Sequence, residues 1–280
     1  MPELPEVESV RRLLERALVG RTIVEVEAAP DPIVFEGLSP EMVCAAVLGK
    51  SVEGTGRKGK IFWLELSAKP WLFGHLGMSG WVRELGAVGP RLVSHGEAPL
   101  DDEDGRPRFL KLMLTTDEGR RVAFTDGRRL GRIWIGEDPA RDPRVAAMGP
   151  DVLLSPVSAE DLAAVVARRK TPIKSLLLDQ KLFAGVGNWV ADEVLYQARI
   201  APARPAQSLS SGELAALADA LKRVVEFAVE VDADADRYPE DWLFAHRWGG
   251  KYGSEAVMGM AIRRDKIGGR TTAWVPDLQR

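Results

Sequence analysis

The hydrophobic pattern of the chain changes near residue 150. Before that point, short segments either alternate apolar and polar residues or run apolar, with tight turns such as residues 117–120 between them. Such segments are typical of β-strands. The pattern therefore predicts a mostly antiparallel β-sandwich, flanked by helices, over residues 1–150. The expected strands lie within residues 22–28, 60–67, 71–85, 109–125 and 132–136.

Two helices are predicted within this β-rich part. Residues 5–18 begin with Pro5, which suits a first helical turn, and their apolar residues recur every three or four positions. Residues 39–49 begin with Ser39, a favourable N-cap residue. This second segment holds Cys44, which is the single cysteine and so cannot form an internal disulfide. We expect it to be a buried structural thiol rather than a nucleophile.

Beyond residue 150 the apolar residues recur with helical spacing. Ser210 and Glu213 have the spacing of a capping box. We therefore predict a helical domain over residues 151–235 and, because residues 236–280 are rich in Gly, Arg and β-forming residues, a small hairpin module after it. The chain as a whole is expected to belong to the α+β class. The expected helices lie at residues 158–170, 171–182, 188–200 and 210–231.

The charge of the chain is nearly balanced overall but locally uneven. A net charge of −3 argues against a protein that binds nucleic acid by overall charge alone. Yet 14 of the 38 Lys and Arg residues fall in four short windows. Solvated surface charge explains any one window, whereas four of them favour a basic groove for a nucleic-acid backbone. The windows are residues 57–60, 128–132, 168–174 and 263–270.

The first residues of the chain offer a nucleophile. If Met1 is removed, Pro2 becomes an N-terminal secondary amine, and α-amino groups titrate near pH 7.7–8.0. Such an amine can attack a sugar C1′ and form an iminium, with Glu3 beside it as the proton donor. The alternative is that this segment is only a favourable helix start.

A glycine-rich turn within residues 174–195 suggests a phosphate site. Gly185 and Gly187 frame the turn, and Asn188 is expected to cap the following helix. Backbone N–H groups at a helix start, together with the Asn188 side chain, suit a phosphate. A tight helical hairpin, with glycines that serve backbone geometry alone, explains the same pattern.

Two short loops hold residues that could fill a gap in DNA. His75 and Met78 lie in the segment 75–80, and Arg128 and Leu130 lie in the segment 125–131. An apolar Met and Leu beside an Arg could form a wedge that replaces an everted base. Taken alone, a methionine such as Met78 is more often part of a core.

These motifs occur in an order that resembles the formamidopyrimidine-DNA glycosylase and endonuclease VIII family, on the formamidopyrimidine side. The resemblance spans nearly the whole chain. It implies that Pro2 is the Schiff-base nucleophile, Glu3 the acid in base removal and Lys60 a residue that assists strand cleavage. The motifs are residues 2–8, 56–60, 75–80, 125–131, 170–195 and 268–280.

The same resemblance implies further site residues. Arg270, at the tip of the C-terminal hairpin, matches an arginine that clamps phosphate and contributes to the catalytic site. Glu6 and Glu193 match acidic residues near the catalytic amine. The position of Leu130 usually carries Phe in the family, so stacking is expected to be weaker here. The DNA-binding positions implied are His75, Met78, Arg128, Leu130, Lys170 and Asn188.

The C-terminal end departs from most bacterial relatives, which carry a four-cysteine zinc finger. The corresponding places here hold Gly249, Tyr252, Val275 and Leu278, so no metal site and no cofactor are expected. The segments 237–247 and 268–280 instead resemble the zincless finger of plant and fungal members. We expect Trp274, Val275, Leu278 and Tyr252 to pack a small apolar core in place of metal bonds.

The resemblance implies a monomeric base-excision repair enzyme that acts on damaged double-stranded DNA as a glycosylase and an abasic-site lyase. Residues 230–242 are short and acidic where the zinc-bearing branch has a longer lesion-covering loop, so formamidopyrimidines and hydantoins are expected to be better substrates than 8-oxoguanine. Endonuclease VIII-like activity on oxidised pyrimidines is the main alternative. A catalytically silent damage binder and an RNA-binding module are two others.

The expected location is the cytoplasm or nucleoid of a bacterium, or the nucleus of a eukaryote. No stretch is long and apolar enough for a membrane span, and the acidic start is unlike a signal peptide.

Overall fold

The computed structural model describes residues 2–96, 98–248 and 254–280. It divides into two compact units, residues 1–147 and residues 148–280. The first unit is built around antiparallel sheets and the second is mainly helical, which confirms the predicted α+β class. The separate hairpin domain over 236–280 stays a prediction.

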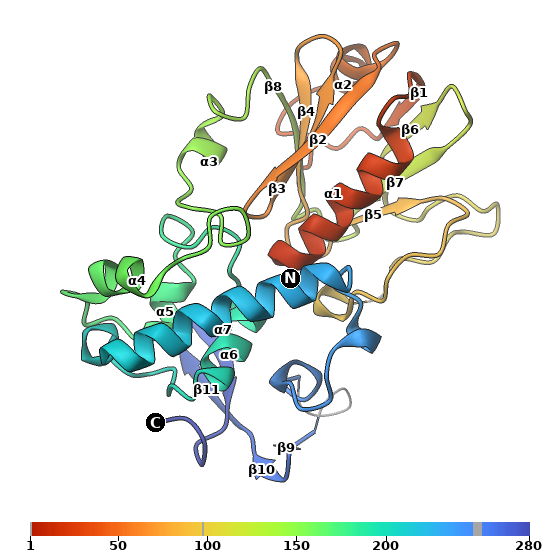
Figure 1. Cartoon of the computed structure of the whole chain (residues 1–280). Coiled ribbons are helices and arrows are strands. Elements are labelled where there is room, and N and C mark those ends of the chain that lie inside the picture. The colour runs from red at the N-terminus through yellow and green to blue at the C-terminus, as the bar shows by residue number, and fades with distance from the viewer. Residues whose placement is uncertain (1, 97, 249–253) are drawn as a thin grey trace. The chain divides into compact units, whose positions relative to one another are not determined.

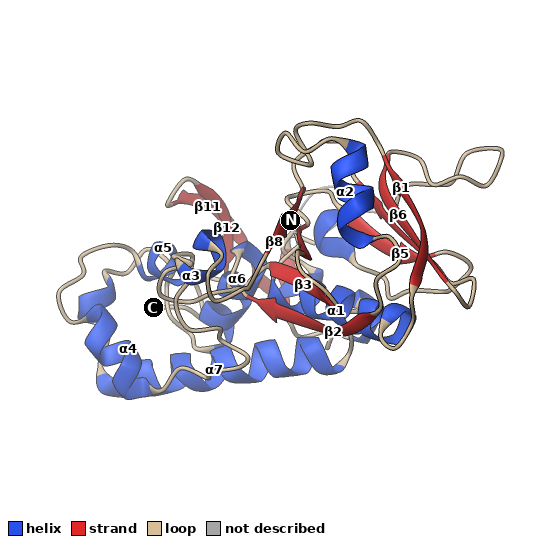
Figure 2. Cartoon of the chain, turned by 90° about the horizontal axis from the view of Figure 1, so that it is seen from above, coloured by secondary structure: helices blue, strands red, loops and turns tan. Residues whose placement is uncertain are grey.

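The first unit contains two four-stranded antiparallel sheets. Figure 2 shows their strands in red. The first sheet has the order β1-β6-β7-β5, with β1 at Ile23–Ala28, β6 at Leu110–Thr116, β7 at Arg121–Thr125 and β5 at Trp81–Glu84. The second has the order β2-β3-β4-β8, with β2 at Val52–Lys58, β3 at Ile61–Leu66, β4 at Trp71–His75 and β8 at Arg132–Gly136.

A single apolar core joins the two sheets to helices α1 (Leu4–Leu18) and α2 (Pro40–Val47). The alternation of β6 places Leu112 and Leu114 in this core. Helix α1 contributes Val7, Val10 and Leu14, as the predicted helix requires. The core therefore ties the N-terminal helix firmly to both sheets. Two short helices complete the unit, η1 at Val93–His95 and α3 at Pro143–Ala146.

Strand β2 was not among the predicted strands, because Gly54 and Gly56 weaken its sequence pattern. The structure gives a reason for the second glycine. A Cβ atom on Gly56 would lie 2.2 Å from the indole ring of Trp63 on the neighbouring strand. The glycine is therefore required by a close approach between β2 and β3.

The second unit is mainly helical. Ser210 and Glu213 form the predicted capping box of its longest helix, α7. One boundary prediction is wrong: Gly187 is the N-cap of α6, and Asn188 is the first helical residue.

Among the residues that the structure describes, none of the helices has the length and apolar character of a membrane span. The helices are α4 at Ala159–Val166, α5 at Ile173–Leu177, α6 at Asn188–Gln197, η2 at Ala206–Ser208, α7 at Ser211–Glu230, η3 at Ala235–Arg237 and η4 at Leu243–Ala245.

The C-terminal part of this unit forms the predicted hairpin, with β11 at Arg263–Ile267 and β12 at Arg270–Trp274. A smaller pair precedes it, with β9 at Ala256–Val257 and β10 at Met260–Ala261. Gly268 and Gly269 form the turn with positive φ angles of 58° and 77°, which glycine adopts readily.

The hairpin rests on a small apolar core that includes Val275 and Leu278, as expected. Trp274 does not join this core. It is half-buried, and its Nε1–H donates to Asp265 across the hairpin at 2.9 Å. Gly249 and Tyr252 lie outside the described residues. The other members of the core are Tyr196, Leu243, Val257, Met260, Ile262 and Ala273.

Candidate functional site

The N-terminal end of α1 holds Pro2, Glu3 and Glu6, and all three residues are buried. Glu3 is the N-cap, and its backbone N–H donates to Glu6 Oε2 at 3.0 Å, as part of a capping box. Burial, and then the negative charge of Glu3, raises the pKa of Glu6 above its ordinary value. Local packing thus holds Pro2 and Glu3 next to each other at the start of a rigid helix.

Lys60 lies in the tight turn between β2 and β3, and His75 ends the neighbouring strand β4. Burial, together with the charges of Lys60 and Arg132, lowers the pKa of His75 to about 4. The His75 ring is therefore neutral near pH 7. Its Nδ1 accepts a hydrogen bond from Gly77 N–H at 3.1 Å, so the proton is carried by Nε2. That N–H can donate to a phosphate oxygen.

The loops 75–80 and 125–131 lie against each other, as a wedge requires. A Cβ atom on Gly77, whose φ is +61°, would lie 2.2 Å from the carbonyl oxygen of Leu130. Met78 and Leu130 therefore lie on adjacent loops. The exposed fraction is 39% for Met78 and 38% for Leu130. Arg128 is also exposed. Met78 is therefore not a core residue, and the three predicted wedge residues are all exposed on these two adjacent loops.

A buried carboxylate organises this wedge surface. Asp126 is fully buried and accepts hydrogen bonds from Ser79 Oγ at 2.8 Å and from the backbone N–H groups of Arg128 at 3.2 Å and Gly131 at 2.6 Å. The first donor belongs to the Met78 loop, and the other two belong to the Leu130 loop. One side chain thus connects both halves of the wedge.

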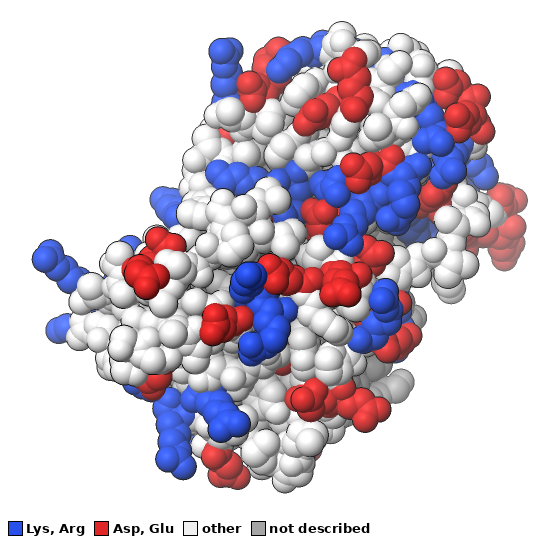
Figure 3. Space-filling view, viewed as in Figure 1, with Lys and Arg blue, Asp and Glu red and all other residues white. Residues whose placement is uncertain are grey.

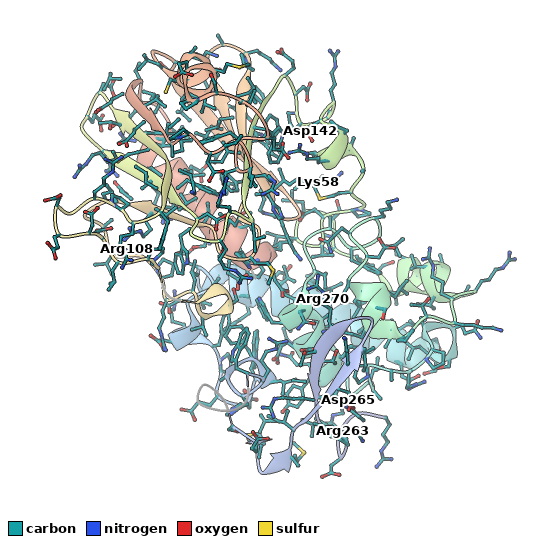
Figure 4. The ribbon with its side chains drawn as sticks, turned by 180° about the vertical axis from the view of Figure 1, so that it is seen from behind. Lys58, Arg108, Asp142, Arg263, Asp265 and Arg270 are labelled. Atoms are coloured by element: carbon teal, nitrogen blue, oxygen red, sulfur yellow. The ribbon has the colours of Figure 1, made fainter. Side chains whose placement is uncertain are left out.

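Phe109 is a candidate that the sequence analysis missed. It is 51% exposed and has a φ of +60°, which is unusual for a bulky residue. Its carbonyl oxygen accepts a hydrogen bond from Asp126 N–H at 3.0 Å, and its ring lies 3.1 Å from where Gly127 would carry a Cβ. The guanidinium of Arg108, labelled in Figure 4, lies 5.3 Å from the ring centre. An exposed aromatic ring in strained backbone beside the wedge suggests a binding role.

The prediction that the basic windows form a groove for a nucleic-acid backbone is wrong in part, because some of their residues are buried and stabilise the fold. Arg57 is only 4% exposed, and its Nε–H donates to Glu8 at 2.9 Å. Lys174 is fully buried. The guanidinium of Arg129 forms a bidentate hydrogen bond with the carboxylate of Asp31. A charge run in the sequence does not distinguish these structural cations from solvated ones.

The basic side chains over α1 are also paired with acidic ones. Figure 3 shows blue and red side chains interleaved on this part of the first unit. Arg11 contacts both Glu8 and Glu15, and Arg12 contacts Glu8. This face is therefore a less suitable surface for DNA than the wedge loops.

In the second unit, α5, a turn and α6 form a helix–turn–helix hairpin. Gln180 holds the turn, because its side-chain amide donates to the carbonyl oxygens of Leu178 at 2.9 Å and Val186 at 2.8 Å. Its Oε1 accepts from Gly185 N–H at 3.1 Å. The turn is thus rigid where Asn188 begins α6.

Asn188 and Arg270 lie close to each other through the backbone of β12. Asn188 Nδ2 donates to the carbonyl oxygen of Thr271 at 2.8 Å, and Thr271 follows Arg270 in the chain. Asn188 Oδ1 is buried and has no hydrogen-bond partner among the described residues. The turn before Arg270 packs closely on α5, since a Cβ atom on Gly268 would lie 2.3 Å from Ser175 Oγ. Figure 4 shows Arg270 on this hairpin, and the residue is exposed.

The other two predicted residues of this unit differ in setting. Lys170 is exposed just before α5. Glu193 is fully buried on α6 and accepts hydrogen bonds from Phe244 N–H at 2.8 Å and from Gln197 Nε2 at 2.9 Å. Burial raises the pKa of Glu193 to about 8. Within its own unit, Glu193 therefore holds the segment around η4 in place.

The residues at the C-terminal end do not fit a zinc ion. Val275 and Leu278 have no metal-binding atoms and belong to the apolar core. Within the residues that the structure describes, no three His, Cys, Asp or Glu side chains are grouped so that they could hold a metal. The absence of a cofactor stays an expectation.

Comparison with known sequences identifies the family. The formamidopyrimidine-DNA glycosylase N-terminal domain matches residues 1–133, and the formamidopyrimidine-DNA glycosylase H2TH domain matches residues 148–239. The chain belongs to the formamidopyrimidine-DNA glycosylase family. A formamidopyrimidine-DNA glycosylase of Arabidopsis thaliana is 41% identical over 280 residues, which cover 100% of this chain and 71% of that protein. One from Geobacter metallireducens is 32% identical, with 100% of each chain covered.

Solved structures of the formamidopyrimidine-DNA glycosylase family share the fold. The Lactococcus lactis enzyme, bound non-covalently to DNA that contains an abasic site, matches with a TM-score of 0.79 and 25% identity over 99% of each chain. A second complex of that enzyme with DNA containing an abasic site gives a TM-score of 0.80 at 24% identity, again over 99% of each chain.

Proposed function

We propose that this protein removes oxidised bases from double-stranded DNA and then cleaves the strand at the resulting abasic site. The observation that supports it most is the start of α1, where Pro2, Glu3 and Glu6 are all buried. A secondary amine at this place, once Met1 is removed, is a nucleophile that works near neutral pH. The names of the relatives, which are DNA glycosylases, agree with the base-removal part of this proposal.

The reaction would begin with attack of the Pro2 nitrogen on C1′ of the damaged nucleotide. The bond between C1′ and the base breaks, and the C1′–O4′ bond then opens. The departing base and O4′ each take up one proton, of which the Pro2 N–H supplies one and Glu3 the other. The product is an iminium that joins Pro2 to C1′. Loss of a proton from C2′ then breaks the C3′–O bond, a second elimination breaks the C5′–O bond, and water releases the sugar fragment.

The contacts with DNA come from several groups. Met78, Arg128 and Leu130 fill the place of the everted base. Lys60 and the Nε2–H of His75 bind backbone phosphates, and so do the groups of the second unit, Lys170, Asn188 and Arg270. Phe109 adds an aromatic face that can stack on a neighbouring base, as the family's usual Phe at the position of Leu130 would.

The preferred lesions are expected to be formamidopyrimidines and hydantoins. The segment from Val231 to Trp242, between α7 and η4, is short and holds the small helix η3. A short segment gives less cover to an everted 8-oxoguanine than a long loop would. Endonuclease VIII-like action on oxidised pyrimidines is the other outcome that a lesion panel would detect.

The test is a set of duplexes that each carry one lesion or one abasic site, incubated with enzyme and borohydride. Borohydride reduces the iminium to a stable amine, so wild type should give a covalent protein–DNA product. Pro2→Gly should reduce this product strongly. Glu3→Gln should lose base removal yet keep part of its action on a preformed abasic site.

The matched control is Glu15→Gln, because Glu15 lies on the same helix and its side chain is 53% exposed. This variant should behave as wild type. The proposal fails if wild type forms no trapped product with any duplex, or if Glu3→Gln removes intact lesions as fast as wild type does.

A further inference from the structure

A buried cluster of three charged residues lies in the second unit, and it contains none of the proposed catalytic or DNA-binding residues. Lys174 and Asp192 have fully buried side chains, and the Arg247 side chain is 6% exposed. Buried charges are rare because their removal from water is costly, so such a cluster needs a reason. Here two cations share one carboxylate.

The carboxylate of Asp192 is the centre of the cluster. Its Oδ1 accepts from the ammonium group of Lys174 on α5. Its Oδ2 accepts from Arg247 Nη2 at 2.5 Å and from the backbone N–H of Ala273 on β12 at 3.2 Å. One side chain of α6 therefore ties together α5, the segment after η4 and the C-terminal hairpin. Figure 1 shows α5, α6 and β11 next to one another in the second unit.

The cluster lies next to two of the proposed phosphate-binding residues, Asn188 and Arg270. Lys174 Nζ also donates to the carbonyl oxygen of Asn188 at 2.7 Å. Ala273 lies three residues after Arg270 on the same strand, and Asn188 Nδ2 bonds to Thr271 between them. The position of the hairpin relative to Asn188 therefore depends on the same contacts that surround Asp192.

A further arginine extends the network on the side of Arg247. The guanidinium of Arg264 donates to the carbonyl oxygens of Arg247 at 3.2 Å, His246 at 3.1 Å and Ser254 at 2.9 Å. It also contacts the carboxylate of Glu255 at 2.9 Å. The segment that carries Arg247 is thus held to β11, which pairs with β12.

We propose that Asp192 is a positioning residue, which sets Asn188 and Arg270 at the spacing that two phosphates of one DNA strand require. This inference rests on the proposed function, because it assumes that both residues bind phosphate. Buried ion pairs contribute little net stability compared with apolar packing, but their geometry fixes how segments meet. The apolar core under the hairpin holds the segments together, and the ion cluster sets their register.

The direction in which one substitution changes the affinity for DNA distinguishes this role from a simple charge effect. Asp192→Asn removes a negative charge, so electrostatics alone would strengthen DNA binding. Positioning predicts the opposite. If one charge-assisted bond to phosphate is broken, affinity should fall about tenfold or more. The slope of log K against log salt should become shallower by about 0.9 for each phosphate that the protein no longer binds.

The experiment measures binding of the whole protein to a duplex with a stable abasic-site analogue, at several salt concentrations. The control is Asp219→Asn, which removes the same charge from an exposed position on α7. Its affinity should equal or slightly exceed that of wild type. Single-turnover base removal by Asp192→Asn at saturating enzyme should stay within about threefold of wild type, since the defect lies in binding.

A second variant guards against a folding defect of Asp192→Asn. Arg247→Met keeps the contact between Lys174 and Asp192 and removes the ion pair between Asp192 and the segment after η4, together with the cation–π contact of Arg247 on Trp248. It should weaken binding less than Asp192→Asn does and should also lower the salt slope. Arg247→Lys, which keeps the charge, should recover part of the affinity. Thermal unfolding of every variant gives the folded fraction.

The outcomes are distinct. If Asn188→Ala and Arg270→Ala bind DNA as wild type does, the proposed phosphate contacts themselves are wrong. If those two variants bind weakly but Asp192→Asn and Arg247→Met keep the wild-type affinity and salt slope, the positioning role alone is overturned. Tighter binding by Asp192→Asn than by Asp219→Asn would overturn it as well.

Discussion

Asp126 in the first unit and Asp192 in the second are both buried carboxylates, at 0% and 1% exposure, yet their partners differ. Asp126 accepts hydrogen bonds from one hydroxyl and two backbone N–H groups. Asp192 accepts from an ammonium group, a guanidinium and one backbone N–H. The same chemical group thus holds one region by neutral donors and the other by ion pairs.

The two sets of donors suit the different structural roles of the two carboxylates. Asp126 shapes two short loops whose backbone must turn sharply near one point, and N–H donors define such turns well. Asp192 connects segments that are far apart in the sequence, from Lys174 to Ala273. Long cationic side chains can reach one carboxylate from separate segments of the chain, although each buried charge carries a desolvation cost.

The largest expected effect is that of Asp126→Ala. It would leave the donors of Ser79, Arg128 and Gly131 without this acceptor, at a cost of about 1–3 kcal/mol for each donor that stays buried. We expect the free energy of unfolding to fall by about 3–5 kcal/mol. Base removal should fall by about 100-fold, while cleavage at a preformed abasic site, which needs no eversion of a base, should fall less.

Ser79→Ala is the graded control for that experiment, because it removes a single hydrogen bond and should cost about 1 kcal/mol. Denaturant unfolding and single-turnover assays on both substrates give the comparison. Equal decreases of base removal and abasic-site cleavage in Asp126→Ala would contradict a role for Asp126 in the wedge.

An intermediate effect is expected for Phe109→Ala. Stacking of one base on an aromatic ring contributes about 1–3 kcal/mol, so base removal should slow by about tenfold. The free energy of unfolding should change little, because the Phe109 side chain is half exposed. Alanine at this position would have the same unfavourable positive φ, so the substitution does not relieve the backbone strain. Phe109→Trp should keep the activity, and Val88→Ala, a change at a fully exposed site, should have no effect. A decrease of activity in Phe109→Trp equal to that in Phe109→Ala would argue against stacking.

The smallest effect concerns pH and a third buried carboxyl group. The pKa of Glu193 is raised to about 8 from 4.5, so the folded protein keeps a proton that the unfolded chain releases. The stability that this contributes is fully present below pH 4.5 and is lost as the pH rises through about 8. Glu193→Gln should remove this dependence.

Thermal unfolding of wild type and Glu193→Gln between pH 5 and 9 tests that point. Relative to the variant, the Tm of wild type should fall by at least about 2–4 °C over this range, since each kcal/mol shifts Tm by about that amount. A wild-type Tm that rises with pH relative to the variant would show that Glu193 is ionised in the folded protein.

Local patterns predicted the local structure well. The spacing of Val7, Val10 and Leu14 and the Ser210–Glu213 pair led to α1 and to the capping box of α7. The alternating segments led to the antiparallel sheets. The prediction failed at β2, where Gly54 and Gly56 obscure the strand, because the approach of Trp63 depends on the neighbouring strand.

Side-chain partners could not be predicted in the same way. Nothing in the basic windows marks Arg57 or Lys174 as buried, because their acceptors, Glu8 and Asp192, are distant in sequence. Phe109 has no motif of its own, and its interest arises from its exposure and its contact with Gly127. Such features depend on tertiary packing and can be found only in the folded chain.

The most direct test of the proposed chemistry is to find which atom of the protein becomes joined to DNA. Wild-type protein would be trapped on abasic-site DNA with borohydride, digested and sequenced by mass spectrometry. Met1 should be absent from the active protein, and the reduced sugar should be attached to the nitrogen of Pro2. A sugar attached to Lys60 or another lysine, or Met1 retained in every trapped molecule, would contradict that chemistry.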